Sequence, residues 1–480
     1  MTGFREELPE SGTESQPAVP SRIFAMTSHP LDTENRIVAG DLRPTNIRWR
    51  IMALVTVVNM LPALGKISLG VTGKYIQEEF RFSDSTMGWM LSAFVVGYAL
   101  FQFPAGWAGD RYGPRKVLTL SILWYSLFLA AMAVVPSLPL ARWIGLAWSF
   151  AMIRFLVGAG EAFTSPNSAK IVGSWMSSGK LGFGISFYNL GIGAGGALTP
   201  VFIAATMQAW GWRTSFCLAG LIAFLFALAW WFYVTDRPEN HSAVNSAELE
   251  LLHPRSTTAT GRPIRNLAAG PPPWHAMFSS RSVWCLILSY MCRAYAMYFF
   301  DTWFFIYLNR ARGLTILKSG FWGASPYLAI LLLSPLGGWA SDIAVRKFGN
   351  RRGRQTAVWI GMACSALLLA VGCRISNNTL AILLVAAGAG FNMFANISFW
   401  ATCIDLTPSY AASLSGLMNM CGALSGGLAP ILTGYIASSF GWAWALDLIA
   451  ILSLVSAGLW FFVHADENLE RQLVPLSPRP

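Results

Sequence analysis

Long apolar stretches recur along most of the chain, and short polar or glycine-rich stretches separate them. Many of them reach 18 residues with few charges, which is long enough to cross the hydrocarbon core of a bilayer as a helix. Helices are expected because a backbone in lipid must satisfy its own hydrogen bonds. The pattern therefore predicts an all-α membrane protein with twelve transmembrane helices, at residues 50–75, 86–109, 116–136, 143–168, 181–207, 213–235, 282–308, 319–343, 355–374, 379–403, 410–437 and 442–464.

A short signature of glycine and aspartate occurs twice, each time at the end of an apolar stretch and before a basic loop. The first copy, at residues 106–115, reads GWAGDRYGPR, and the second, at residues 338–347, reads GWASDIAVRK. A series of such pairs in the same order indicates an internally repeated membrane protein of six plus six helices. Three further pairs keep an offset of 230 or 231 residues: 158–160 with 388–390, 195–200 with 426–430, and 211–212 with 441–442.

The repeat divides the chain into two predicted six-helix bundles, at residues 46–235 and 281–465. The remaining segments are polar. We expect residues 1–45 to be a disordered cytoplasmic N-terminus, residues 236–280 a cytoplasmic linker and residues 466–480 a cytoplasmic tail. The residues before Met26 show no structural pattern, so Met26 as well as Met1 is a candidate start.

Composition and charge agree with a membrane protein. The chain is 54% hydrophobic and only 12% charged, whereas soluble domains carry about 25% charged residues. The net charge of +11 could indicate a nucleic-acid partner, but the basic residues gather in alternate loops, such as 111–116 and 346–354, and are absent from the loop at 438–441. This asymmetry predicts that the basic loops and both termini face the cytoplasm. The expected location is a bacterial inner membrane.

Catalytic or metal-binding clusters are not apparent in the sequence. The seven cysteines lie in apolar stretches or at their ends without metal-site spacing, and the five histidines are scattered outside the spans or at a span end. We therefore expect no enzyme, metal site or cofactor, and the lipid bilayer is an expected partner. A monomer without a nucleic-acid partner is the expected state.

Two cations lie in spans that the repeat makes equivalent. An ionisable group inside a span costs roughly 2.5–3.5 kcal/mol on insertion scales and usually faces an internal cavity. Arg293, moved back by 230 residues, corresponds to position 63, nearly one helical turn from Lys66. We therefore expect Lys66 and Arg293 to face each other across the midplane and to hold an anion. The alternatives are that Lys66 snorkels to the interface and that Arg293 pairs with Asp301, eight residues further on.

Arg154 and Glu161 lie seven residues apart on one face of the fourth predicted span. A carboxyl group buried in a span can carry a proton, so Glu161 is the candidate for proton coupling, with Arg154 as its partner. The alternative for each residue is a structural salt bridge to another helix. Asp301 and Asp405 lie near span ends and are expected to be capping or interface groups.

Polar and aromatic side chains in the spans indicate a polar substrate, because Asn and Tyr bind hydroxyl groups and Trp can stack on a sugar face. For each of these residues alone, hydrogen-bonded helix packing is the alternative. The predicted substrate-binding residues are Lys66, Arg293, Tyr98, Tyr298, Trp400 and Asn419, with Asn59, Asn189, Asn392, Asn396 and Ser398 as further candidates.

The duplicated signature and the parallel six-plus-six repeat resemble the major facilitator superfamily over residues 48–464. The resemblance implies a pseudo-symmetric fold whose first motif latches the two halves together in the outward-facing state. The second copy has Ile343 where the first has an arginine, so it is expected to latch less well. The alternative is a plain basic loop that only sets topology. The residues that take the latch role are Gly106, Asp110, Arg111, Gly113, Arg115 and Asp342.

Three segments are similar to the anion:cation symporter branch of that superfamily: the stretch from Arg154 to Ala162, residues 302–313 and residues 415–419. That branch includes bacterial hexuronate, galactonate, tartrate and phthalate transporters and animal sialin and vesicular glutamate transporters. Bacterial members typically carry Asp-Arg in the first helix, where this chain has Gly65 and Lys66. The resemblance implies that coupling rests on Glu161 alone or is altered.

The expected function is secondary active transport of a small organic carboxylate, a sugar acid or a dicarboxylate, with proton symport by alternating access. If coupling is lost with the acid of the first helix, the protein is a potential-driven uniporter or an anion exchanger of the same substrates. A drug-type antiporter is less favoured because the charges in the spans are mainly basic. A sensor without turnover is a further alternative.

Overall fold

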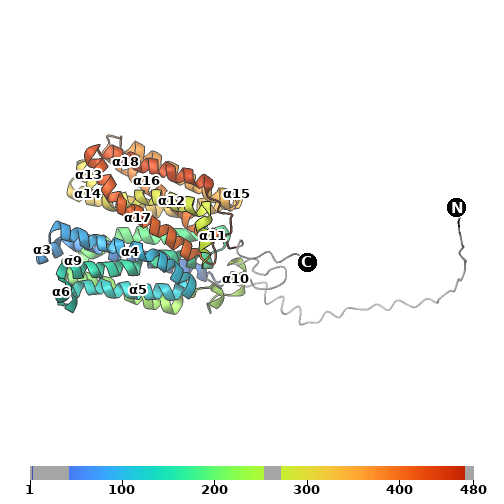
Figure 1. The fold of residues 1–480 in the computed structure, drawn as a ribbon, viewed down its shortest axis with the longest axis horizontal. Coiled ribbons are helices and arrows are strands. Elements are labelled where there is room, and N and C mark those ends of the chain that lie inside the picture. Colours follow the sequence, from blue (N-terminus) through green and yellow to red (C-terminus); the bar gives the residue numbers. More distant parts are fainter. Residues whose placement is uncertain (1–2, 4–42, 253–271, 471–480) are drawn as a thin grey trace. The chain divides into compact units, whose positions relative to one another are not determined.

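The computed structural model describes residue 3 and residues 43–252 and 272–470. Three predictions therefore lie wholly or mostly outside the described residues. They are the disorder of residues 1–45, of which only residues 3 and 43–45 are described, the choice of Met26 as the start, and residues 471–480 of the predicted tail. The described part of the chain is built from helices and contains no strands (Figure 1).

The first half of the chain forms one series of helices. The kinked first crossing is α2 (Ile47–Met60) with α3 (Pro62–Phe80), and Pro62 stands at the kink. The other helices of this half are α4 (Asp84–Tyr112), α5 (Pro114–Ala131), α6 (Pro139–Ile144), α7 (Leu146–Glu161), α8 (Thr164–Trp175) and α9 (Leu181–Tyr233).

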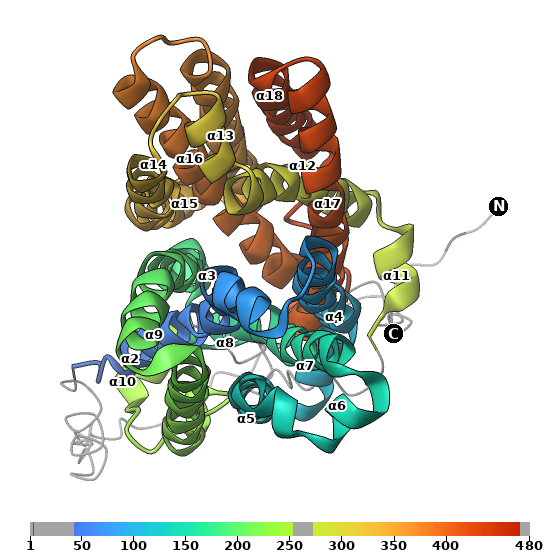
Figure 2. The same ribbon diagram turned by 90° about the vertical axis from the view of Figure 1, so that its left-hand side faces the viewer.

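The second half repeats the series (Figure 2). Its helices are α12 (Arg281–Thr302), α13 (Phe304–Arg310), α14 (Ile316–Gly323), α15 (Ser325–Gly372), α16 (Asn378–Leu406), α17 (Ala411–Ser439) and α18 (Trp442–Leu459).

Twelve crossings follow from the ten helical stretches within the described residues that are long and apolar enough to span a membrane. Two of these stretches, Leu181–Tyr233 and Lys318–Gly372, have 53 and 55 residues, about twice what one crossing needs. Each is divided by a glycine with a positive φ, Gly211 at 83° and Gly349 at 79°, a conformation that glycine adopts without steric cost. The ten stretches thus give the twelve predicted helices.

Three charged residues of the sequence analysis lie near the ends of helices. Lys66 lies in the first turns of α3, directly after the Pro62 kink. Glu161 is the last residue of α7, before the short break that separates α7 from α8. Asp301 lies in the last turn of α12, before α13 begins. Each of these residues therefore lies within a few residues of a helix end.

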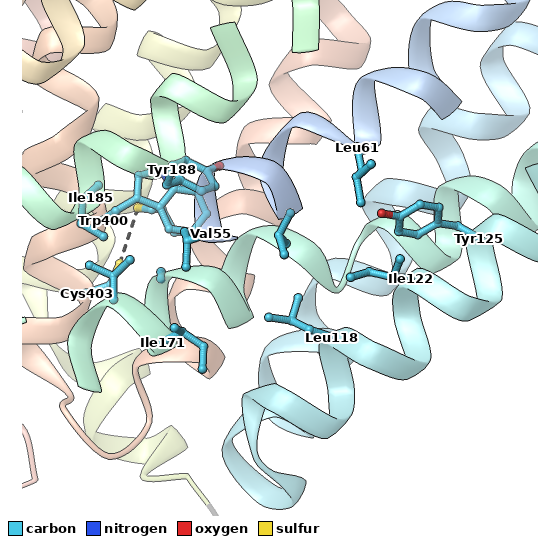
Figure 3. Packing of buried hydrophobic residues seen from close by; sticks show 14 of the residues in the cluster. Val55, Leu61, Leu118, Ile122, Tyr125, Ile171, Ile185, Tyr188, Trp400 and Cys403 are labelled. Carbon is cyan, nitrogen blue, oxygen red and sulfur yellow. Dashed lines mark hydrogen bonds between the residues drawn. The ribbon is translucent and has the colours of Figure 1, made fainter. Parts of the chain in front are cut away.

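Contacts between the halves follow the internal repeat. The motif-bearing helix α4 packs against α17, and the first part of α15, which carries the second motif, packs against α9. Buried side chains of both halves meet between them. Tyr188 of α9 lies against Trp400 of α16, with ring centroids 5.0 Å apart (Figure 3). Within the first half, glycine lets α4 and α7 approach closely, because a β-carbon on Gly158 would collide with the Phe94 carbonyl oxygen.

The segment between the two halves packs against helices of the first half. The short helix α10 (Ser246–Leu252) contributes Glu248, whose buried carboxylate accepts hydrogen bonds from the backbone N–H groups of Ile47 and Arg48 at 3.1 Å each. Trp274 of α11 (Trp274–Ser279) lies 5.0 Å from the ring of Phe103. The described parts of the predicted linker thus include two helices that contact the first half.

Candidate functional site

The first motif copy joins the two halves through Asp110. Its carboxylate accepts hydrogen bonds from the backbone N–H groups of Ser413 at 2.7 Å and Ala412 at 3.3 Å, in the first turn of α17, where the positive end of the helix dipole favours an anion. Lys170 Nζ lies 2.5 Å from Asp110 Oδ1. A β-carbon on Gly106 would collide with the Ala412 carbonyl oxygen, so glycine permits this close contact.

The second copy makes the corresponding contact. Asp342 accepts hydrogen bonds from the backbone N–H groups of Gly182 at 2.7 Å and Phe183 at 2.8 Å, at the start of α9. This copy has no arginine directly after its aspartate, but Arg354 lies nearby. Its Nη1 is 3.5 Å from Asp342 Oδ1, and its Nε is 3.1 Å from Asp405 Oδ2. The second aspartate therefore caps a helix of the opposite half as the first one does.

The other residues of the first motif contact their own half. Arg115 donates from Nε and Nη2 to the Trp231 carbonyl oxygen at 3.2 and 2.5 Å, and its backbone N–H donates to Asp236 at 2.6 Å. Gly113, with φ at 89°, begins α5 beside the same carboxylate. Arg111 has an exposed side chain. A latch role for Arg111, Gly113 and Arg115 stays a prediction.

Arg154 and Glu161 are both buried and meet at Gly65. Arg154 Nη1 donates to the Gly65 carbonyl oxygen at 2.5 Å. The Glu161 carboxylate occupies the space that a side chain at position 65 would need, because a β-carbon there would overlap Glu161 Oε1. Both side chains therefore contact Gly65. The residue that replaces the expected acid of the first helix is thus the one that makes room for Glu161.

Lys66 binds a carboxylate of the opposite half. Its Nζ lies 2.6 Å from Asp301 Oδ2 on α12, and the Tyr327 hydroxyl donates to Asp301 Oδ1 at 2.8 Å. The ammonium group lies 5.6 Å from the centre of the Tyr298 ring, a cation–π distance. Lys66 keeps 47% of its side-chain surface exposed. Asp301 is therefore an interface group, and its ion pair is with Lys66 and not with Arg293.

Arg293 is buried among neutral groups. Its Nη1 donates to Asn392 Oδ1 at 3.0 Å, and the guanidinium lies over the Tyr290 ring, 4.7 Å from the centroid. The side chain is 4% exposed. Among the residues that the structure describes, no carboxylate lies within ion-pair distance of this guanidinium. Arg293 therefore carries a buried positive charge with neutral ligands.

A cluster of amides and phenols connects the halves beside Arg293. Asn419 Nδ2 donates to the Tyr98 hydroxyl at 3.2 Å and to Gln102 Oε1 at 2.9 Å, and the Tyr290 hydroxyl donates to Asn419 Oδ1 at 3.0 Å. Trp400 lies beside this cluster, with its ring 6.2 Å from that of Tyr290. The predicted residues Tyr98, Asn419 and Trp400 are thus brought together.

The two cations contact different tyrosines of α12. Lys66 lies near the Tyr298 ring, and Arg293 lies over the Tyr290 ring, which Asn419 connects to Tyr98. That Lys66 and Arg293 face each other across an anion stays a prediction. The sequence-based set lacked Tyr188, Tyr290, Gln102 and Tyr327. Of these, Tyr290 lies three residues before Arg293 on the same helix face, a signal that could have identified it.

Comparisons with known proteins fit this geometry. A family model described as Major Facilitator Superfamily matches residues 55–430. A D-galactonate transporter of Escherichia coli O6:H1 is 30% identical over 433 residues, which cover 88% of this chain and 97% of that protein. A probable sulfoacetate transporter of Cupriavidus necator is 27% identical and covers 82% and 88%, and a probable galactarate/D-glucarate transporter of Bacillus subtilis is 27% identical and covers 83% and 88%.

Solved structures agree on the fold. The proton:xylose symporter XylE bound to 6-bromo-6-deoxy-D-glucose superposes with a TM-score of 0.70 at 16% identity, covering 88% of this chain and 98% of that one. A bacterial homologue of the iron transporter ferroportin in an outward-facing state gives 0.64 at 14% identity, with 86% and 98% covered. The predicted fold and the prediction of a non-enzymatic, multi-pass transporter are confirmed. The chain belongs to the Major Facilitator Superfamily and is similar, within it, to the galactonate and glucarate type of anion transporter.

Proposed function

We propose that this protein is a secondary active transporter that moves a small organic carboxylate across the bacterial inner membrane by alternating access. The observation that carries the proposal is Arg293, a buried cation of the second half with neutral ligands, beside the cluster that connects the two halves. A buried charge is costly unless an opposite charge compensates it, and a bound carboxylate supplies that charge. The relatives named as galactonate, galactarate/glucarate and sulfoacetate transporters support the same substrate class.

The substrate contacts follow from the polar cluster. A carboxylate binds the guanidinium of Arg293, which can present two parallel N–H donors. Hydroxyl groups of the substrate bind Tyr98, Asn419 and Tyr298, and Trp400 packs against the carbon skeleton. Lys66 borders the same site from α3. Because these residues come from both halves, movement of one half against the other exposes the bound anion to one side of the membrane at a time.

Proton coupling rests on Glu161. Protonation neutralises its carboxylate and weakens the attraction to Arg154, which frees that guanidinium from its electrostatic partner. Gly65 supplies no second acid on the first helix, so a single carboxyl group beside Arg154 carries the proton. The absence of an acid at position 65 also favours a second candidate, a potential-driven uniporter or an anion exchanger for the same substrates.

Topology and assembly follow the charge pattern. The loops that carry the two motifs hold the basic residues, so this side faces the cytoplasm, together with both termini. Asp110 and Asp342 then hold the cytoplasmic ends of the halves together, and transport requires both contacts to open. Each half supplies part of one central site, so the working unit is a monomer in the lipid bilayer.

Uptake into proteoliposomes tests the proposal. The wild type and Glu161→Gln are compared with labelled galactonate, glucuronate, galactarate, tartrate and glutamate, with and without an inward proton gradient. We expect one acid to accumulate in the wild type when the gradient is applied, whereas Glu161→Gln exchanges it without accumulation. Uptake that ignores the gradient identifies the uniporter or exchanger. Absence of uptake of every acid by a correctly folded protein refutes the proposal.

A further inference from the structure

Asp301 supplies a carboxylate of the protein itself at the proposed anion site. We propose that Asp301 is a specificity-determining residue, which occupies Lys66 and thereby restricts the transported anion to one carboxylate group. The inference rests on the proposed function and narrows its substrate class. It separates acids with one carboxylate, such as galactonate, from diacids, such as galactarate, and relatives of both kinds are similar to this chain.

The geometry holds Asp301 in place on both of its oxygens. Oδ2 binds Lys66 Nζ at 2.6 Å, and Oδ1 accepts the hydroxyl hydrogen of Tyr327 at 2.8 Å. These three side chains come from α3, α12 and α15, so both halves contribute to the contact. A short, charge-assisted hydrogen bond of this kind is stronger than a neutral one. The Lys66 ammonium is therefore already matched by a fixed carboxylate.

Arg154 and Arg293, the other two cations in the spans, differ in the groups that surround them. Arg154 donates to the Gly65 carbonyl oxygen, Glu161 contacts the same glycine, and the proposed function assigns this pair to proton coupling. Arg293 has neutral ligands, Asn392 and Tyr290, and within the described ranges it has no carboxylate at ion-pair distance. Arg293 is thus the cation that the proposed function leaves to an incoming carboxylate. The second carboxylate of a diacid, placed near Lys66, meets the negative charge of Asp301.

Neutral groups complete the site. Tyr298 lies near Lys66, and Tyr98 and Asn419 offer hydroxyl and amide groups beside Tyr290, over whose ring Arg293 lies. Such groups hydrogen-bond hydroxyls well and compensate a second full charge poorly. The ligand that matches one available guanidinium and several neutral polar groups is a polyhydroxylated monocarboxylate. Removal of the charge of Asp301 releases Lys66 as a second cation, and a diacid then finds two cationic partners.

Competition measurements on the full-length protein in proteoliposomes test this inference. Uptake of labelled galactonate is inhibited with unlabelled galactonate or galactarate in the wild type, Asp301→Asn and Asp301→Glu. In the wild type, we expect galactarate to inhibit at least about tenfold more weakly than galactonate. In Asp301→Asn, we expect the inhibition constant of galactarate to fall about tenfold relative to that of galactonate, while Asp301→Glu keeps the preference of the wild type.

The controls separate charge from shape. Tyr327→Phe removes the second contact of Asp301 but keeps its charge, so it is expected to keep the preference for the monoacid. A similar shift in Asp301→Asn and Asp301→Glu attributes the effect to packing and overturns the inference. If Asp301→Asn fails to fold, the wild type still tests the inference. Equal inhibition of its galactonate uptake by galactonate and galactarate contradicts the proposal. If the wild type takes up diacids as readily as monoacids, the transport proposal stands and this inference fails; if it takes up no organic acid, both fail.

Discussion

Arg293 combines burial with neutral ligands, which is the pattern of a residue kept for binding and not for stability. Arg293→Gln is therefore expected to reduce uptake by about 100-fold, since loss of one partner of a buried charge contact costs roughly 2–5 kcal/mol. The melting temperature of the variant is expected to stay unchanged or to rise, because a buried charge without a counter-ion is destabilising. Uptake and thermal unfolding of the purified protein measure the two effects.

Arg213→Gln is the matched control for that substitution. Arg213 pairs with Glu79 at a half-exposed position near a span end, 2.5 Å apart, and exposed pairs contribute little to stability, about 0.2–1 kcal/mol. Uptake by Arg213→Gln should equal that of the wild type. Parallel loss of uptake and stability in Arg293→Gln, without such loss in the control, assigns Arg293 a structural role instead.

Gly65 stands where the family resemblance implied an acid, and the structure shows why a side chain is excluded there. Gly65→Ala places a methyl group on Glu161 Oε1, and overpacking of a tight site costs typically about 1–3 kcal/mol. We expect a lower melting temperature and a loss of gradient-driven accumulation. Gly70→Ala on the same helix has no atom within 4 Å of the new methyl group and should behave as the wild type. Equal stability of the two variants contradicts the tight packing at Gly65.

Partners of the charged residues could be predicted from sequence only in part. The repeat offset brought Lys66 and Arg293 into one region, and helical spacing placed Arg154 and Glu161 on one face. The ion pair of Lys66 with Asp301 depends on how the two halves pack, since these residues are 235 positions apart. Periodicity describes one helix at a time, so it carries no information on which side chains of two separate helices meet.

At the scale of elements, the apolar pattern predicts the crossings well and their ends less well. The first crossing was predicted at residues 50–75, and the structure extends it from Ile47 to Phe80. The extension contains polar residues such as Gln77, Glu78 and Glu79, which remain helical after the apolar stretch has ended. Hydropathy detects the part of a helix that needs lipid, whereas backbone hydrogen bonds and packing decide where the helix stops.

The short helix α10 stabilises the start of the first crossing. Glu248 caps α2 with two backbone hydrogen bonds and has a fully buried side chain. Glu248→Ala is expected to lower the stability of the protein by about 1–2 kcal/mol, the range for loss of a helix cap. Glu250→Ala, on the same short helix with an exposed side chain, is the matched control and should leave the unfolding midpoint unchanged. Thermal unfolding in detergent compares the two variants, and equal midpoints show that the cap contributes no stability.

At the scale of the whole molecule, the repeat in the sequence becomes a pair of equivalent contacts. Both motif aspartates cap a helix of the opposite half, although only the first copy has an arginine directly after the aspartate. The latch role of the two aspartates stays a prediction, and the expectation of a weaker second latch did not take Arg354 into account. This arginine follows Asp342 by twelve residues and reaches it because Gly349 turns the chain back. A loop conformation of this kind is not visible in a linear motif.

The two contacts lie on one interface between two bundles, so they should open together when one bundle rocks against the other. Asp110→Asn removes the charge that binds Ser413 N–H, and Asp342→Asn does the same for Gly182 N–H. Hydrogen bonds to a charged group are worth roughly 1.5–3 kcal/mol, so amide hydrogen exchange at these positions is expected to become about tenfold faster. If the bundles move as units, as proposed, each variant accelerates exchange at the starts of both α9 and α17. Lys116→Gln, an exposed residue in the first turn of α5, should leave the exchange at both helix starts unchanged. Faster exchange only beside the substituted aspartate indicates local fraying and contradicts a coupled opening of the two latches.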